Sequence, residues 1–125
     1  MFKLLSALAL LSLSTSCVAI VAAGAAAVGY IKYTENEASM DFEADLDDTW
    51  EATIDALRDL EYQVNKDYPH GTTEGEIDLA DRETNVKVEL HPEGFTRVRV
   101  RVGTFETDDH KRRAELILKG IQERL

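Results

Sequence analysis

Few residues in this sequence have side chains suited to catalytic or metal chemistry. The chain has one cysteine, Cys17, and three histidines, His70, His91 and His110, which fall at a turn, a strand end and a helix start. A single cysteine excludes an internal disulfide, and no Cys/His cluster has the spacing that binds zinc. The sequence also lacks a GxSxG, HExxH or P-loop motif. We therefore expect a protein that is not an enzyme and that holds no metal.

Cys17 follows an apolar block with the length of a signal-peptide core. The block, LLSALALLSL, comes after Lys3 and is too short to cross a bilayer alone. Three small residues, Ser14, Thr15 and Ser16, then precede the cysteine. The arrangement resembles the lipobox of bacterial lipoproteins, although Ser14 stands where that pattern usually has Leu. The resemblance implies cleavage after Ser16 and covalent diacylglyceryl and acyl (palmitate-type) lipid on Cys17, with no other cofactor.

A lipid on Cys17 would place the chain at the cell membrane or the outer membrane, with the rest facing the periplasm or the cell exterior. Val18, where an Asp would favour retention, resembles the signal for outer-membrane delivery. The alternative is one uncleaved anchor helix from about Leu4 to Tyr33, which is long enough to span. The hydroxyl side chains in its middle disfavour that alternative, because they lower the propensity to insert.

A second apolar segment, VAIVAAGAAAVGYI, follows the cysteine. As a helix it would reach about 21 Å, short of the roughly 30 Å hydrocarbon core. Its small residues recur four apart, as in Ala25 and Gly29, a spacing that lets helices pack closely. Tyr30 and Tyr33 flank Lys32 like an interfacial belt. We expect an N-terminal apolar helix here, and two interpretations of it stay open: a passive hydrophobic tether, or a helix that lies on or dips into the membrane and can self-associate through Ala25 and Gly29.

Charge divides the chain into three parts. All 24 acidic residues follow Tyr33, and only Lys3 and Lys32 are charged before it. We expect a signal peptide (1–16), a lipidated cysteine with an Ala/Gly-rich segment (17–33) and an acidic domain (34–125). The negative charge of the domain repels phosphates and anionic headgroups, so we expect no nucleic acid partner. The expected partners are membrane lipid through Cys17, a second copy, or an envelope protein.

The acidic domain reads as alternating strands with two amphipathic helices. Period-two alternation predicts strands at ASMDFEADL, Tyr62–Val64, GEIDLAD, NVKVEL and TRVRVRVG. LDDTWEATIDALRDLEY predicts a helix with a capping box of Asp48 and Glu51 and with a stripe of Trp50, Ile54, Leu57 and Leu60. A last helix begins near Asp108. The order β-α-β-β-β-β-α predicts an α+β two-layer sandwich, with both helices on one face of an antiparallel sheet.

The other face of this sheet would carry a ladder of arginines. Arg97, Arg99 and Arg101 alternate along one strand, and neighbouring strands carry carboxylates and Lys87. Opposite charges on paired strands stabilise a sheet modestly, so the face can be a solvated one with cross-strand pairs. It can also be an interaction face, on which the arginines meet an anionic partner.

The whole chain resembles a family of small, uncharacterised bacterial lipoproteins. The resemblance rests on the signal with its cysteine, the run ending in GYIKY, LDDTWEATIDALRDLEYQV, and VRVRVGTFETDD before a last helix. It implies lipid anchoring and a small α+β domain, and it supplies no catalytic residues. We expect a membrane-anchored, non-catalytic interaction or structural module. The alternative is a carrier of small apolar ligands, with a cavity lined by aromatic residues: Phe42, Trp50, Tyr62, Phe95 and Phe105.

Overall fold

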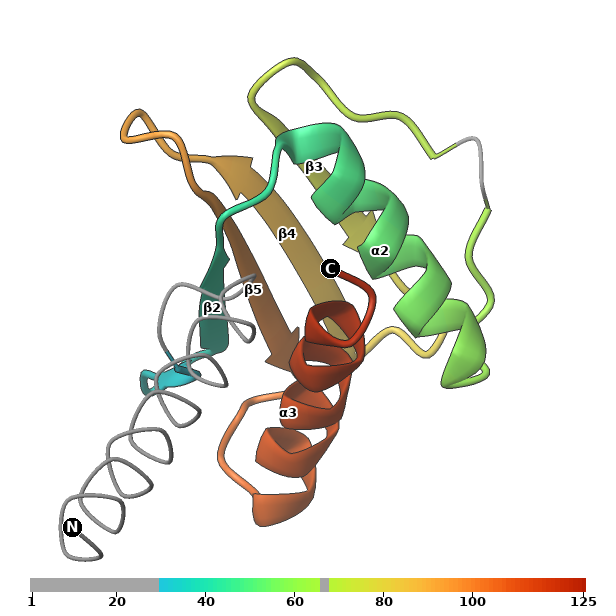
Figure 1. Ribbon diagram of the computed structural model, residues 1–125. Helices are drawn as coiled ribbons and strands as arrows, with labels where there is room; N and C mark the ends of the chain where they lie inside the picture. The colour runs from blue at the N-terminus through green and yellow to red at the C-terminus, as the bar shows by residue number, and fades with distance from the viewer. Residues whose placement is uncertain (1–29, 66–67) are drawn as a thin grey trace, which may run out of the picture.

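A computed structural model describes residues 30–65 and 68–125 of the chain (Figure 1). Its elements, in chain order, are β1 (Lys32–Tyr33), β2 (Ala38–Phe42), α2 (Leu46–Asp59), β3 (Glu74–Asp78), β4 (Thr84–Leu90), β5 (Thr96–Val102) and α3 (Asp108–Gln122). The signal peptide, the lipidation site and the predicted N-terminal apolar helix lie outside the described residues.

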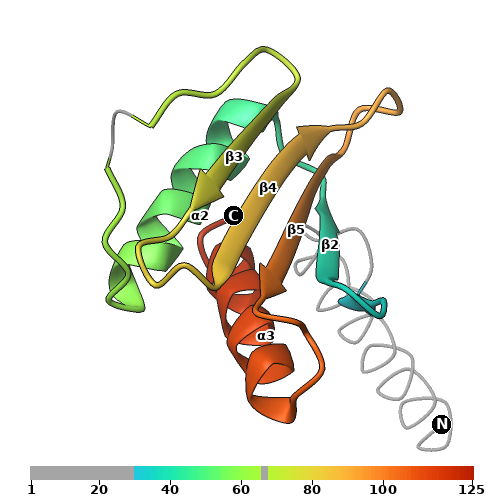
Figure 2. The same cartoon turned by 180° about the vertical axis from the view of Figure 1, so that it is seen from behind.

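The five strands form one antiparallel sheet in the order β1-β2-β5-β4-β3. The last strand in the chain, β5, lies at the centre, between β2 and β4. Both helices lie on the same face of the sheet (Figures 1 and 2). The predicted α+β class, with an antiparallel sheet and two covering helices, is therefore confirmed for the described part of the chain.

Period-two alternation of apolar and polar side chains builds this sheet. On β5 the three valines are fully buried, whereas the arginines between them lie on the opposite face. The cross-strand pairs Val86–Val100 and Val88–Val98 continue the same apolar layer onto β4. Each helix packs on this layer through an apolar stripe whose residues recur three or four apart. Ile54 and Leu57 of α2 and Ile117 and Leu118 of α3 are buried in this contact. The core between sheet and helices follows from these two periods.

The prediction of a strand at Tyr62–Val64 is wrong. Helix α2 ends with Glu61 in the left-handed region, at φ 68°. The N–H of Glu61 donates to the carbonyl of Arg58, and the N–H of Tyr62 donates to that of Leu57. This pair of hydrogen bonds is a Schellman motif, which satisfies the last carbonyls of the helix. Tyr62 therefore completes the helix end, and the segment from Tyr62 to Val64 packs against the core without entering the sheet.

The fifth strand is instead β1, which the pattern of the sequence did not predict. Lys32 and Tyr33 pair with Ser39 and Ala38, and the N–H of Thr34 donates to the carbonyl of Glu37 to close the hairpin. The sheet thus begins two residues before the boundary that charge suggested. A strand of two residues is too short to show a period-two pattern.

The start of α2 also differs from the prediction. Asp45 is the N-cap, because its Oδ1 accepts the N–H of Asp48 at 2.7 Å. The expected cap at Asp48 is therefore wrong by about one turn, since the helix begins at Leu46 and the N–H of Asp48 is itself capped by Asp45. At the other end of the helix, Leu60 was expected in the buried stripe but is 38% exposed, because it lies at the cap, where the helix leaves the core.

A carboxylate closes the turn between β3 and β4. Asp81 accepts the N–H groups of Glu83 and Thr84 on one oxygen and the Thr84 hydroxyl on the other. Burial by itself raises the pKa of Asp81, but the hydrogen bonds from Thr84 and Glu83 outweigh it and hold this pKa below its ordinary value.

Candidate functional site

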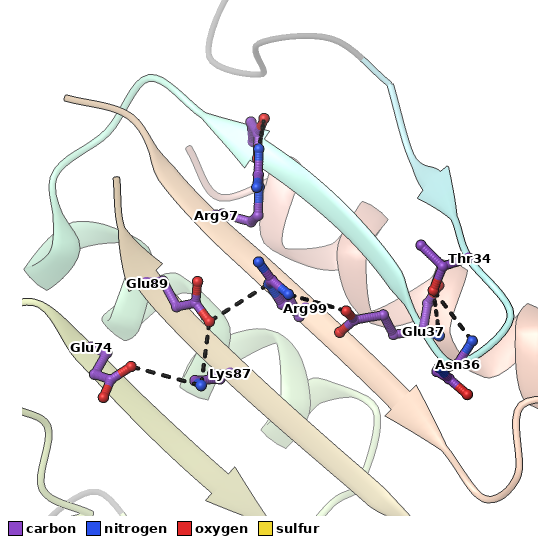
Figure 3. Close-up of polar contacts among 9 residues, drawn as sticks. Thr34, Asn36, Glu37, Glu74, Lys87, Glu89, Arg97 and Arg99 are labelled. Carbon is purple, nitrogen blue, oxygen red and sulfur yellow. Dashed lines mark hydrogen bonds and ion pairs between the residues drawn. The ribbon is translucent and has the colours of Figure 1, made fainter. Parts of the chain in front are cut away.

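The open face of the sheet carries the predicted arginine ladder (Figure 3). Arg97 forms a bidentate pair with Asp41 on the neighbouring strand β2: Nε lies 2.7 Å from Oδ1, and a terminal nitrogen lies 3.1 Å from Oδ2. The guanidinium also lies over the ring of Phe95, 5.5 Å from its centre. The hydrogen bond to Asp41 raises the pKa of Arg97 above its ordinary value. Both Asp41 and Phe95 therefore fix the position of the Arg97 guanidinium.

Arg99 is the centre of a chain of ion pairs that crosses the sheet. It lies 3.2 Å from a carboxylate oxygen of Glu37 and 3.6 Å from one of Glu89. Lys87 then lies 3.5 Å from Glu89 and 3.7 Å from Glu74. Figure 3 shows this chain running from the β1–β2 hairpin over β5 and β4 to β3. The charges along this chain are therefore paired across strands, the arrangement that a solvated face with cross-strand pairs would have.

Arg101 is placed differently from the other two arginines. It is exposed, and its Nε donates to the carbonyl oxygen of Gly103 at 3.3 Å. Among the described residues it is the ladder member without a carboxylate partner. Beside it on β4, the amide of Asn85 donates to Glu76 at 2.7 Å and to Asp78 at 2.6 Å. At this end of the face, Arg101 therefore forms no ion pair with the described residues, and the two nearby carboxylates are bonded to Asn85 instead.

The aromatic residues expected to line a ligand cavity do not converge on one. Phe42, Trp50 and Phe105 are packed in the core, each at most 3% exposed, whereas Tyr62 and Phe95 are half-buried at its margins. The depressions found over the described residues are open to solvent. One, of about 460 Å³, is lined by residues of the β2–α2 connection and of the β4–β5 hairpin: Glu43, Ala44, Asp45, Leu90, Glu93, Gly94 and Phe95.

A cluster around His70 was not anticipated from the sequence. The Nε2 of His70 lies 3.2 Å from the carboxylate of Asp47, and its Nδ1 lies 2.8 Å from the carbonyl of Gly71. Its ring packs against Trp50, with the ring centres 5.0 Å apart, and both side chains cover Gly75 of β3. The cluster fastens the loop before β3 to the first turn of α2. The sequence around His70 indicated a turn, but it gave no sign of the contacts with Asp47 and Trp50.

Two structural findings bear on metal binding and on membranes. Within residues 30–65 and 68–125, no three His, Cys, Asp or Glu side chains are grouped so that they could hold a metal ion. Neither helix in this part of the chain is long and apolar enough to cross a membrane. Ser16, Cys17, Ala25 and Gly29 all lie outside the described residues, so their predicted roles stay predictions.

The fold and this face define a class of protein: a small two-layer α+β domain whose open sheet face is covered by paired charges. Over residues 1–124 the chain matches the family described as a protein of unknown function (DUF3568), and it belongs to that family. A comparison with the curated proteins finds no match.

Proposed function

We propose that this chain is a lipid-anchored, non-catalytic interaction module of the bacterial cell envelope. The observation that carries the proposal is the position of Cys17, directly after an apolar block and three small residues and shortly before the folded domain. Fifteen residues lead from Cys17 to Lys32, where the sheet begins. This stretch spans at most about 50 Å fully extended and about 22 Å as a helix. A lipid on Cys17 would therefore hold the domain close to the membrane.

The features of the domain support an interaction module rather than a carrier. The aromatic side chains are used in packing the core, and the depressions over the described residues are open. The broad exposed surface is the open sheet face. The basic row on β5 has Asp41 of β2 on one side, and on the other side β4 separates it from the carboxylates of β3. Because most of these charges are already paired, a partner with both signs of charge fits this face better than a purely anionic one.

The anchor is tested by the intact mass of the protein extracted from membranes. We expect a species that lacks residues 1–16 and carries lipid on Cys17, and we expect the Cys17→Ser variant to lack it. Ser12→Ala, which changes the apolar block but not the residues next to the cysteine, serves as the matched control and should be processed like the wild type. A full-length, unmodified mass for the wild-type protein would instead mean an uncleaved anchor helix.

The interaction face is tested by photo-crosslinking in intact cells. A photoreactive residue in place of Arg101 lies on the open sheet face, and one in place of Glu51 lies on the exposed side of α2. The proposal expects a discrete adduct with an envelope protein, or with a second copy, from position 101 and none from position 51. Equal labelling at both positions, or none at 101, would contradict an interaction through this face.

A further inference from the structure

Three of the four exposed large hydrophobic side chains of the described residues lie on or beside one helix, α3 (Asp108–Gln122), and the fourth is the first described residue. The four are Tyr30, Tyr33, Leu60 and Leu116, exposed by 75%, 49%, 38% and 49%. Leu116 lies in the middle of α3, and it lines an open depression together with Leu60 at the end of α2. On the other flank of α3, Tyr33 of β1 interacts with Glu115. We name these four residues the α3 band.

Most charges next to the α3 band are paired: Asp59 forms an ion pair with Arg124 beside Leu60, whereas Glu123, in the same depression, has no ion-pair partner among the described residues. Lys119 and Glu115 form an ion pair at 2.6 Å, and this contact raises the pKa of Lys119. Burial, and then the charge of Glu115, raise the pKa of Tyr33 above its ordinary value. Moving such a surface out of bulk water costs less than moving isolated charges.

The other two broad surfaces are unsuited to an apolar environment. The exposed side of α2 is strongly acidic, and its carboxylates are those of Asp47, Asp48, Glu51 and Asp55. The open sheet face carries the ion-pair chain and the uncompensated Arg101. Of the described surfaces, the α3 band is therefore the one that combines exposed apolar side chains with charges that are mostly paired.

The band also lies where the domain joins the rest of the chain. Tyr30 is its first residue, and β1, which follows at once, lies at the edge of the sheet (Figures 1 and 2). Tyrosine and leucine, with lysines such as Lys32 and Lys119 beside them, are the side chains that settle at the boundary between headgroups and acyl chains. A domain held by a short tether would present this side to the bilayer first.

We propose that the domain docks on the membrane through the α3 band, with Tyr30, Tyr33, Leu60 and Leu116 seated in the lipid headgroup layer. The inference rests on the proposed lipid anchor at Cys17, which brings the band to the surface. Docking fixes the orientation of the domain, so that the open sheet face is presented at a set angle to a partner. The band contacts the lipid surface itself, not a protein.

The test uses the full-length lipidated protein in vesicles of phosphatidylethanolamine and phosphatidylcholine. One variant carries a fluorophore on Glu123→Cys, an exposed position that lines the same depression as Leu116 and Leu60. A second carries it on Glu93→Cys, in the β4–β5 hairpin at the opposite end of the sheet from β1 (Figure 1). Quenching by a doxyl-labelled phospholipid is measured at both, and flotation measures whether the protein is on the vesicles.

Docking predicts strong lipid quenching at position 123 and weak quenching at position 93. Combining Tyr30→Ser with Leu116→Ser should lower the ratio of docked to undocked protein about tenfold, since two exposed apolar side chains lose their contact with lipid. The matched control, Gln63→Ser with Thr104→Ser, changes two exposed neutral residues elsewhere and should leave the ratio unchanged. Both variants alter exposed side chains, and circular dichroism checks that they fold.

Three outcomes would overturn the inference, and they can be told apart. Equal, weak quenching at both positions in protein that floats would mean that the anchor holds but the domain does not dock. Weak lipid quenching at 123 together with energy transfer between labelled copies would mean that a second copy covers the band. Failure of the wild-type protein to float would refute the proposed anchor, and the docking with it.

Discussion

Trp50 of helix α2 packs closely on the sheet at Gly75, and this contact leads to a specific prediction of stability. A Cβ atom at this position would lie 2.6 Å from Cβ of His70 and closer still to Cζ3 of Trp50. Carbon atoms in contact normally stay 3.5–4.0 Å apart, so an added methyl group overlaps its neighbours by about 1 Å. Gly75→Ala must therefore displace Trp50, His70 or the first turns of α2.

The size of this effect follows from two opposing contributions. Overpacking a well-filled core costs about 1–3 kcal/mol. Replacing glycine by alanine also restricts the unfolded chain, which returns about 0.4–1 kcal/mol. We therefore expect Gly75→Ala to lower the free energy of unfolding by about 1–2 kcal/mol, which for a domain of this size lowers Tm by roughly 4–15 °C.

Urea unfolding followed by circular dichroism and by fluorescence measures this loss. Trp50 is the only tryptophan in the chain, so its emission reports on the packing at Gly75 directly. Gly71→Ala is the matched control: its Cβ would meet only the carbonyl oxygen of Glu74, at an ordinary 3.4 Å, so its stability should stay unchanged or rise slightly. If Gly75→Ala were as stable as Gly71→Ala, with unchanged tryptophan emission, the close contact at Gly75 would be refuted.

Three further predictions concern the polar face and the turns. Arg97→Ala should lower the free energy of unfolding by about 1–3 kcal/mol, because it leaves the carboxylate of Asp41, whose side chain is 13% exposed, without its partner. Arg101→Ala should change the free energy of unfolding by less than about 0.5 kcal/mol in the same urea assay. Equal losses for the two variants would contradict the pairing of Arg97 with Asp41. The pKa of Asp81 in the folded state lies below its ordinary 3.8. The ionised carboxylate therefore stabilises the fold above about pH 4, and this stabilisation is lost as the pH falls through the folded-state pKa. The Asp81→Asn variant should therefore be less stable than the wild type at pH 7, and the difference should shrink as the pH falls below 3.8; a constant difference would refute the linkage. Glu61→Gly should raise the unfolding free energy by about 0.5–1 kcal/mol in thermal melts, since φ is 68° at this position, and a loss of stability would show that the Glu side chain matters more than its backbone strain.

Local patterns in the sequence were enough to predict most of the architecture. The alternation of valine with arginine from Thr96 to Val102 fixes which side of β5 is buried whatever its neighbours are, because successive side chains of a strand point to opposite faces. Helix α3 is likewise defined by its own stripe of Ala114, Ile117, Leu118 and Ile121. Where period and element length agree, the fold class follows without tertiary information.

The errors fall where a single backbone conformation outweighs the pattern. Tyr62–Val64 has the composition of a strand, but Glu61 adopts a left-handed conformation that commits Tyr62 to the end of α2. Glycine is the usual residue at such a helix end, so a glutamate gives no warning of it. Lys32 and Tyr33 show the opposite case: they join the sheet because the hairpin turn brings them against β2, although their own sequence belongs to an apolar run.

The sequence by itself determined the period of each main strand and helix, the division between an apolar N-terminal part and an acidic domain, and the presence of an arginine ladder on one sheet face. Only the tertiary structure decided what each arginine contacts. Arg97 and Arg99 meet carboxylates of neighbouring strands, whereas Arg101, equally placed in the pattern, meets a backbone carbonyl. The physical reason is register: which side chains lie opposite each other depends on how strands distant in the chain align, and spacing within one strand carries no information about that alignment.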